Sequence, residues 1–365
     1  MRKYYIDNLR SFTVLLVVFY HILYLFHPAI PAGVIGPIAA APWLDAVPYL
    51  LYPWFMLILF LISGMCARFY LETHSGKEFF RARTRKLLVP STVGLLAFGW
   101  VQGYFNMAIS HALSSLAGAP APLRYLILCA SGTGVLWTIQ VLWLLSLILL
   151  LVRRLEKGRL LPYGAEVKLP LLLFLGIPAW GAAQILNTPV IVVYRFGLYG
   201  FGFLLGYYVF SHEAVTDRLK QHALPLLAAA LLLGGAYTCT TYGQNFAQAP
   251  AVNSPLAIGY AWVMCLALMG CFKKWADRSG PLAGFLSRKS FGLYVFHYPA
   301  LSAAAYFLIK YTHLPAAPVY LLVTAAAFAG GLLLYEIISR IPVVRWCVLG
   351  IRRPREEKKE REGHV

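Results

Sequence analysis

Long apolar runs alternate with short polar connections along almost the whole chain. A helix needs about 20 apolar residues to cross a hydrocarbon core about 30 Å thick. Only helices and closed barrels satisfy their backbone hydrogen bonds within lipid. The pattern therefore predicts an all-α, polytopic transmembrane helical bundle of about ten spans, covering residues 9–27, 48–69, 87–109, 135–152, 169–186, 190–210, 223–241, 257–272, 290–309 and 318–340.

Composition excludes a soluble domain. The 365 residues are 60% hydrophobic and 13% charged, with a mean hydropathy of +0.67, whereas soluble domains carry about 25% charged residues. The first run holds a histidine and ends in His27-Pro28 with no small-residue cleavage site, so we interpret it as a span and not as a signal peptide. We expect one transmembrane domain over residues 1–345 and a charged tail over residues 346–365.

Basic residues predict the orientation. When alternate connections are assigned to opposite sides, about 29 of the 32 Lys and Arg fall on one side, leaving Arg124, Arg195 and Lys310. The positive-inside rule places that side, and both termini, in the cytoplasm. The net charge of +18 then reflects topology and anionic lipid, not nucleic acid. The cytoplasmic set includes Arg2, Lys3, Arg81, Arg83, Arg85, Lys86, Arg153, Arg154, Lys157, Arg159, Lys273, Lys274, Arg288, Lys289 and the basic residues of the tail from Arg352 to Arg361.

Two ionisable residues of the first span are the leading candidates for chemistry. Arg10 lies at the inner interface, and His21, eleven residues later, lies roughly 16 Å deeper, near mid-bilayer. Ionisable groups inside a membrane are costly and are functional candidates by default. The alternative is a histidine that only bonds a neighbouring helix. An imidazole with a pKa near neutrality can take a proton from an attacking hydroxyl.

A basic cluster precedes the third span. Arg83 and Lys86 are one helical turn apart at its cytoplasmic mouth, where cations suit a phosphorylated carrier. An ordinary positive-inside loop is the alternative, and we prefer it for Arg85. His297, about eight residues into the ninth span, lies roughly 12 Å deep, so two histidines reach similar depths.

Other polar positions have two interpretations each. Ser63-Gly64 allows close helix packing or contacts the donor directly. Trp137 belongs to the interfacial aromatic belt or stacks on a sugar. Arg195 extends outward to the interface or lines a polar acceptor cavity. Tyr294 and His297 form a helix-packing pair or belong to the site.

Five segments together resemble the acyltransferase-3 family of integral membrane acyltransferases, and the resemblance covers nearly the whole chain in order. Within the family, the chain is most similar to the branch of glucan-biosynthesis succinyltransferase-like proteins. The segments are Tyr5-Ile6-Asp7-Asn8-Leu9-Arg10 with His21, Ile62-Ser63-Gly64, Arg83-x-x-Lys86-Leu87-Leu88-x-Pro90, Leu136-Trp137-Thr138-Ile139-Gln140-Val141-Leu142 and Ser290-Phe291-Gly292-Leu293-Tyr294-Val295-Phe296-His297-Tyr298-Pro299.

The resemblance implies transfer of an acyl group from cytoplasmic acyl-coenzyme A to a hydroxyl of a sugar or similar acceptor outside the membrane. It implies His21 as the catalytic residue, with Arg10, Arg83 and Lys86 facing the donor. Two positions depart from the family pattern. Lys86 replaces an arginine and loses its planar fork, and Gln140 replaces a frequent acid, so that an ion pair with a cation such as Arg195 is lost.

We therefore expect a cytoplasmic-membrane O-acyltransferase with His21 as general base and acetyl- or succinyl-coenzyme A as donor. Membrane lipids, a glycan acceptor and a second copy of the chain are the expected partners, and no metal is expected. A transporter or flippase for an anionic metabolite or glycolipid is the main alternative, and a non-catalytic scaffold is another. The expected donor site comprises Arg10, Ser63, Arg83 and Lys86, and the expected acceptor site comprises Trp137, Gln140, Arg195, Tyr294 and His297.

Overall fold

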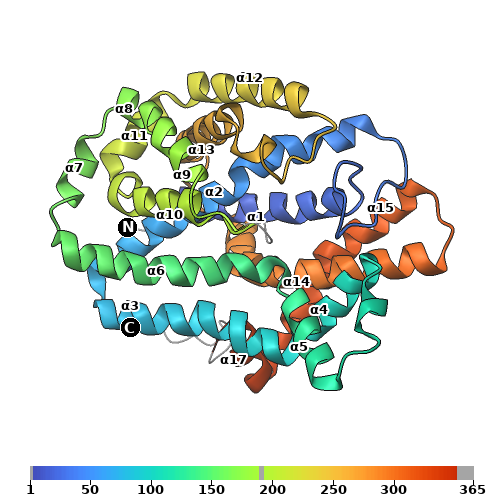
Figure 1. Cartoon of the computed structure of the whole chain (residues 1–365). Helices are drawn as coiled ribbons and strands as arrows, with labels where there is room; N and C mark the ends of the chain where they lie inside the picture. The colour runs from blue at the N-terminus through green and yellow to red at the C-terminus, as the bar shows by residue number, and fades with distance from the viewer. Residues whose placement is uncertain (1–2, 189–192, 352–365) are drawn as a thin grey trace. The chain divides into compact units, whose positions relative to one another are not determined.

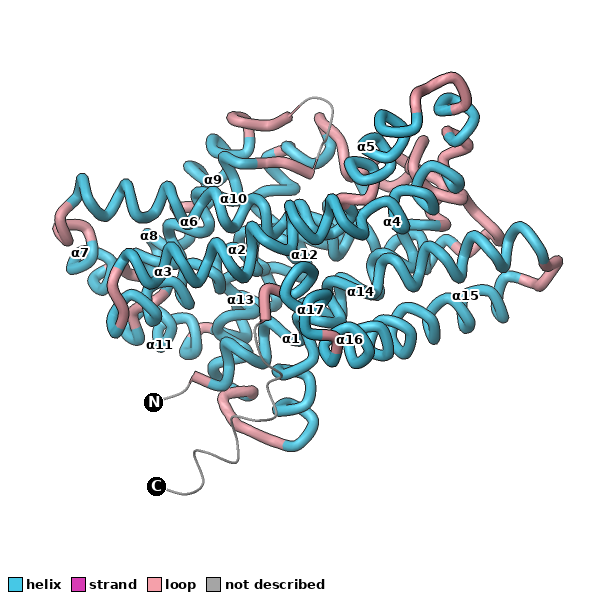
Figure 2. Tube along the Cα trace, turned by 90° about the horizontal axis from the view of Figure 1, so that it is seen from below, coloured by secondary structure: helices cyan, strands magenta, loops and turns pink. Residues whose placement is uncertain are grey.

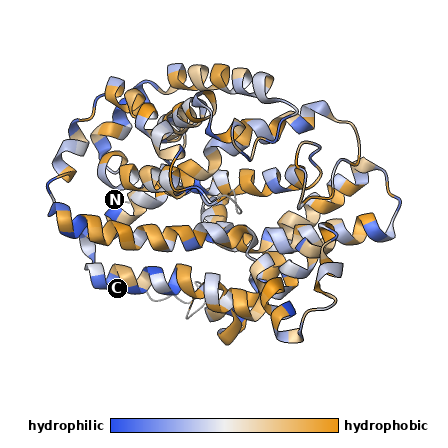
Figure 3. Cartoon of the chain, in the orientation of Figure 1, coloured by the Kyte–Doolittle hydropathy of each residue, from blue (hydrophilic) through white to orange (hydrophobic). Residues whose placement is uncertain are grey.

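The computed structural model describes residues 3–188 and 193–351, and within these ranges it is helical with no strand (Figure 2). Most helices are apolar along their length, with polar residues at their ends and in the connections (Figure 3). Among the described residues, eight helical stretches are long and apolar enough to cross a membrane: Tyr4–Leu25, Pro42–Thr73, Gly76–Ile109, Gly134–Glu156, Ala223–Thr241, Pro255–Trp275, Pro281–Tyr311 and Ala316–Arg340. The predicted all-α polytopic fold is confirmed.

The fifth and sixth predicted spans correspond to shorter helices. They are α8 (Leu169–Phe174), α9 (Gly176–Ala183) and α10 (Phe196–Leu205), which η5 (Gly206–Phe210) continues. Pro178 has no N–H to donate to the carbonyl of Phe174, which accounts for the break at Leu175. The connection between these spans is longer than predicted, because α9 ends at Ala183 and α10 begins only at Phe196. The count of ten spans stays a prediction.

The chain divides into two compact units. Unit 1 comprises residues 1–79 and 144–290, and unit 2 comprises residues 80–143 and 291–365. The unit boundaries fall inside three helices, α3 (Gly76–Arg83), α6 (Trp137–Glu156) and α14 (Pro281–Tyr311). The further helices of unit 1 are α1 (Tyr4–Leu25), α2 (Pro42–Thr73), α7 (Leu161–Glu166), η5 (Gly206–Phe210), α11 (Glu213–Gln221), α12 (Ala223–Thr241), η6 (Ala251–Asn253) and α13 (Pro255–Trp275).

Helix α2 forms the centre of unit 1. It packs against α1, α10, η5, α12 and α13, and α12 in turn lies alongside α13 (Figure 1). Glycines allow the closest approach: a Cβ at Gly64 would overlap the carbonyl of Phe203, and one at Gly206 would overlap that of Leu61. Small residues are the usual means of helix packing in lipid, where apolar side chains gain no hydrophobic energy by meeting one another. The packing interpretation of Gly64 is confirmed.

Unit 2 contains an apolar helix that the sequence analysis missed, α5 (Ala121–Ser131), which packs against α4 (Leu95–Ile109) (Figure 1). Gly103 and Gly132 bring the two backbones together, since a Cβ at either would overlap the opposite carbonyl. The other elements of unit 2 are η1 (Thr84–Leu88), η2 (Pro90–Gly94), η3 (Leu113–Leu116), η4 (Gly134–Leu136), α15 (Ala316–Ala325), η7 (Ala326–Gly330), α16 (Gly331–Arg340) and α17 (Pro342–Leu349).

Two wide π-helical turns, η1 and η2, interrupt the helix that runs from Gly76 to Ile109. Pro90 supplies no N–H to the preceding turn, so one backbone hydrogen bond is missing there. The hydroxyl of Ser91 donates to the carbonyl of Leu87 at 2.7 Å, and that of Thr92 donates to Leu88 at 2.6 Å. Hydroxyl groups thus satisfy carbonyls that lipid cannot, and the helix continues through the proline.

The predicted division at residue 345 falls inside α17 and stays a prediction. Of the predicted cytoplasmic cations, Arg2 and those from Arg352 to Arg361 lie outside the described residues.

Gly64→Ala should lower the thermal unfolding temperature of the detergent-purified protein, because the added methyl overlaps the backbone of α10. Forced overpacking typically costs about 1–3 kcal/mol. Gly235→Ala is the matched control, since nothing lies within 4 Å of a Cβ there and alanine is favoured in helices. Equal unfolding temperatures for Gly64→Ala and Gly235→Ala would contradict the close α2–α10 contact.

Candidate active site

Arg10 and His21 lie on one unbroken helix, α1. Eleven residues at 3.6 residues per turn bring the second side chain to within about 20° of the first around the helix axis. The spacing therefore places the guanidinium and the imidazole on the same face, one roughly 16 Å above the other. Arg10 is already paired, since its Nη2 lies 2.7 Å from Oδ1 of Asp7.

The hydrogen bond of His21 fixes which ring nitrogen is basic. Nδ1 lies 2.8 Å from the carbonyl oxygen of Val17, and a carbonyl oxygen only accepts. Nδ1 therefore carries the proton, which leaves Nε2 as the nitrogen that can take one from a substrate. The ring is half-buried, so it is not sealed inside the helix packing.

Tyrosines surround the imidazole. The ring centroid of His21 lies 5.2 Å from that of Tyr20 and 6.5 Å from that of Tyr24. The ring of Tyr20 also packs against α2: its centroid lies 5.7 Å from that of Tyr52 and 5.0 Å from that of Phe55. An aromatic layer thus connects the candidate base on α1 to the central helix of unit 1.

Ser63 is used within its own helix. Its hydroxyl donates to the carbonyl of Leu59 at 2.7 Å, and the side chain is half-buried. Such a bond to the preceding turn is the ordinary state of serine in a transmembrane helix. The described geometry gives the serine no base, which agrees with a role other than nucleophile.

Arg195 does not extend outward to the interface. It directly precedes α10 and is only 3% exposed. Its Nη2 donates to Oδ1 of Asn253 at 2.8 Å and to the carbonyl of Val252 at 3.2 Å. The arginine that the sequence left without an obvious partner is therefore buried and held by neutral groups.

The second group of predicted site residues belongs to unit 2. Arg83 ends α3 and is half-buried, whereas Lys86 lies in η1 and is exposed. The two cations lie in consecutive elements of the stretch Gly76–Ile109, and their role toward the donor stays a prediction. Gln140 donates from Nε2 to the carbonyl of Ser91 at 3.2 Å, which joins α6 to the π-helical segment that follows Lys86.

Tyr294 joins α14 to the beginning of α6. Its hydroxyl lies 2.7 Å from that of Thr138 and 3.0 Å from the carbonyl of Val135, next to the half-buried Trp137. His297 is fully buried, and its Nδ1 lies 2.8 Å from the carbonyl of Tyr294. The ring centroids of Tyr294 and His297 lie 6.1 Å apart, and each side chain also forms the hydrogen bonds just described, so the packing pair and the site role both stay predictions.

The predicted site residues therefore form two groups. Unit 1 holds Arg10, His21, Ser63 and Arg195, and unit 2 holds Arg83, Lys86, Trp137, Gln140, Tyr294 and His297. Within unit 1, the aromatic layer extends from His21 through Tyr20 and Tyr52, and Tyr52 interacts electrostatically with Arg195. Within unit 2, Trp137 and Gln140 lie at the beginning of α6, and Tyr294 of α14 hydrogen-bonds the same part of α6. His297 lies one turn after Tyr294 on α14.

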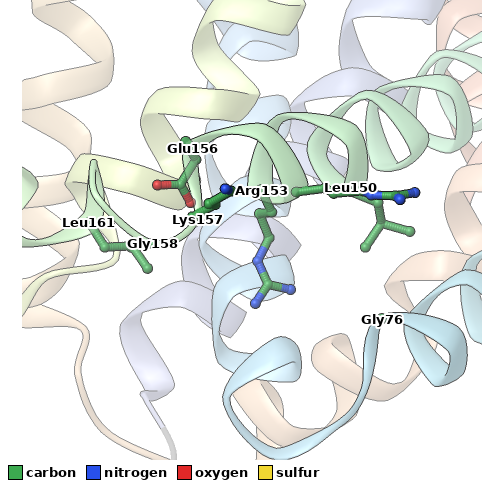
Figure 4. Close-up of a pocket in the computed structure, with 8 residues that line it drawn as sticks. Gly76, Leu150, Arg153, Glu156, Lys157, Gly158 and Leu161 are labelled. Atoms are coloured by element: carbon green, nitrogen blue, oxygen red, sulfur yellow. The ribbon is translucent and has the colours of Figure 1, made fainter.

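A basic hollow at the end of α6 was missed. It has a volume of ≈ 380 Å³, and its lining includes Arg153, Arg154, Glu156 and Lys157 (Figure 4). Arg153 and Glu156 leave the helix in different directions, and Glu156 accepts from the hydroxyl of Tyr208 at 3.3 Å. The sequence analysis counted these cations only toward orientation, because a charged helix end carries no signal for a concave surface.

Comparison with known proteins completes the assignment. The helices and intramembrane ionisable side chains define a multi-pass membrane protein with a candidate site for chemistry. The family model of the acyltransferase domain of the acyltransferase-3 family matches residues 3–336, so the chain belongs to that family and is a membrane acyltransferase. The searches of curated proteins and of solved structures find no match.

His27 is a buried histidine that the sequence analysis treated only as the end of a span. It is 2% exposed, and its ring packs on Phe246 with centroids 5.0 Å apart. The N–H of Ala29 donates to Nδ1 at 3.1 Å, so Nε2 carries the proton and donates to the carbonyl of Asp45 at 2.9 Å. Burial of this neutral ring lowers the pKa of His27 below its usual value.

Acidification should destabilise the fold through His27. In the unfolded state His27 binds a proton near pH 6.5, whereas in the folded state it does so only at lower pH. The stability that the neutral ring of His27 contributes is therefore complete above pH 6.5 and is lost as the pH falls toward the pKa of the folded state. His27→Gln should reduce the drop in unfolding temperature between pH 7.5 and 5.5. Exposed His74→Gln should keep it. An unchanged drop in His27→Gln would refute this account.

Proposed function

We propose that the protein transfers an acetyl or succinyl group from cytoplasmic acyl-coenzyme A to a hydroxyl of an extracytoplasmic carbohydrate, as in the glucan-biosynthesis succinyltransferase-like branch of its family. The observation that carries the proposal is the hydrogen bond from Nδ1 of His21 to Val17, which leaves Nε2 as the basic nitrogen on the face of α1 that also carries Arg10. The protein then resides in the cytoplasmic membrane, with both termini inside.

The proposed reaction uses His21 twice. Nε2 takes the proton of the acceptor hydroxyl while its oxygen attacks the thioester carbonyl, which gives a tetrahedral intermediate. Collapse of the intermediate breaks the carbon–sulfur bond and forms the ester. The imidazolium returns its proton to the departing thiolate, so that coenzyme A leaves as a thiol and the neutral ring is restored.

Arg10, Arg83 and Lys86 are the proposed partners of the donor phosphates, and Ser63 is also proposed to contact the donor. Guanidinium groups bind phosphate through paired, charge-assisted hydrogen bonds, and Lys86 contributes a point charge. Trp137, Gln140, Arg195, Tyr294 and His297 are proposed to face the acceptor side. Several of these have structural bonds, so their contribution is to shape and polarity and not to proton transfer.

His21→Ala should abolish transfer while the protein stays folded in the membrane. Loss of a general base typically costs on the order of 10²–10⁴ in rate. The measurement is turnover of labelled acetyl- and succinyl-coenzyme A by the purified protein with a panel of glycans, and exposed His222→Ala is the control. Near-normal product formation by His21→Ala would remove this histidine from the mechanism.

Arg83→Gln and Lys86→Gln should raise the KM for acyl-coenzyme A more than they lower kcat, and should weaken the salt dependence of binding. Lys86→Arg should lower that KM, because it restores the bidentate fork. Arg153→Gln is the matched control from the hollow on α6. A larger KM change in Arg153→Gln than in Arg83→Gln would move the donor phosphates to that hollow.

Sidedness distinguishes a transferase from the transporter alternative. In oriented vesicles, acyl-coenzyme A is supplied on the face that carries Arg83 and the glycan on the other. Acylated glycan outside with free coenzyme A retained inside is expected, because only the acyl group crosses. Unaltered substrate on the opposite face would indicate a transporter, and product formed only when both substrates share the inner face would refute the two-sided site.

A further inference from the structure

Arg195 is a buried cation with bonding capacity left over. Among the described residues, its Nη2 donates to Oδ1 of Asn253 and to the carbonyl of Val252, and both partners are neutral. Its Nε is buried and has no hydrogen-bond partner among the described residues. A guanidinium carries five N–H groups, so this arginine has unused donors inside the protein.

In the described part of the chain, no carboxylate is paired with this charge. Within residues 3–188 and 193–351, no aspartate or glutamate forms an ion pair with Arg195. The undescribed residues just before it, 189–192, are Pro-Val-Ile-Val and contain no acid. Burial of an unpaired charge is costly, and the cost falls when an anion arrives with the substrate.

Phenol groups complete the surroundings. The hydroxyl of Tyr237 on α12 is buried without a hydrogen-bond partner in the described part of the chain, and it interacts electrostatically with Arg195. Tyr52 on α2 and Tyr199 on α10 interact with the same guanidinium. One cation and several hydroxyl donors match an oxyanion with a single negative charge.

This group of residues is connected to His21. Tyr52 lies against Tyr20, whose ring is the neighbour of the imidazole on α1, and Tyr24 also interacts with Tyr52. All of these residues belong to unit 1. The layer of tyrosines thus leads from the proposed base to the buried cation.

We propose that Arg195, together with Tyr237 and Tyr52, binds a carboxylate of the substrate. The proposal rests on the proposed function and narrows its substrate class to one that carries a single carboxylate near the reacting groups. That carboxylate belongs either to the acyl group, as in a dicarboxylic half-thioester such as succinyl, or to the acceptor, as in a uronic acid.

A kinetic experiment identifies the source. Wild type, Arg195→Gln and Arg195→Lys are assayed with acetyl- or succinyl-coenzyme A, each with a neutral glycan and with its uronic-acid counterpart. Arg195→Gln should lower kcat/KM at least about tenfold for carboxylate-bearing substrates and less than about threefold for uncharged ones. Arg195→Lys should lower kcat/KM for carboxylate-bearing substrates by a factor between those of wild type and Arg195→Gln. Arg124→Gln, which removes an exposed arginine from the same predicted side, is the control.

The pattern of losses decides the proposal. A loss that follows the donor assigns the carboxylate to the acyl group, and a loss that follows the acceptor assigns it to the glycan. Equal losses for all four substrate pairs, or none, would overturn the subsite, because a purely structural arginine does not distinguish charged from uncharged substrates.

A binding measurement keeps the test independent of turnover. Succinate or glucuronate should raise the unfolding temperature of wild type in a concentration-dependent way, and succinamide or glucose should not. Tyr237→Phe removes a hydroxyl that has no hydrogen-bond partner among the described residues, so the variant should fold normally yet show a smaller carboxylate effect. If the wild type shows no turnover but succinate or glucuronate still raises its unfolding temperature, the proposed function is overturned and the carboxylate subsite is not. A carboxylate effect unchanged in both Tyr237→Phe and Arg195→Gln would overturn the subsite.

Discussion

Lipid offers no water to a buried polar group, and this constraint governs both the fold and the site. Hydroxyls such as those of Ser63 and Ser91 return to the carbonyls of their own helices, and a glycine such as Gly64 lets two backbones meet where lipid gives apolar side chains no reason to associate. Most polar groups are satisfied in this way. Arg195 is an exception among the described residues, because its charge is buried among neutral partners and its Nε has no hydrogen-bond partner there. Because the described residues leave this charge without a counter-ion, we expect a substrate anion to neutralise it.

The chemistry depends on a hydrogen bond within a single helix turn. Donation from Nδ1 of His21 to the carbonyl of Val17 sets the tautomer of the imidazole. His297 contrasts with it. That ring is fully buried and bonded to its own helix, which suits helix packing in unit 2 more than proton transfer. Two histidines at similar predicted depths therefore have different surroundings: the ring of His21 is half-buried, whereas that of His297 is fully buried.

Much of the architecture could be predicted because it depends on local properties of the chain. Apolar length gave the membrane class and eight of the expected spans, and the eleven-residue spacing placed Arg10 and His21 on one helix. The shortened fifth and sixth spans were not predicted, since the run of apolar residues hides the break that Pro178 introduces. Helix α5 was missed for a related reason: its run of apolar residues is short, and its stability comes from glycine contacts with α4.

The sequence by itself determined the helical membrane class, the acyltransferase family and the candidate base, because these follow from residue types at fixed spacing along one helix. Tertiary structure alone decided what surrounds each polar group. Asn253, Tyr52 and Tyr237 come from segments far from Arg195 in the chain. Asp45, whose carbonyl accepts from the buried ring of His27, lies on the next helix. Burial and hydrogen bonding depend on neighbours that only folding brings together, and periodicity carries no information about them.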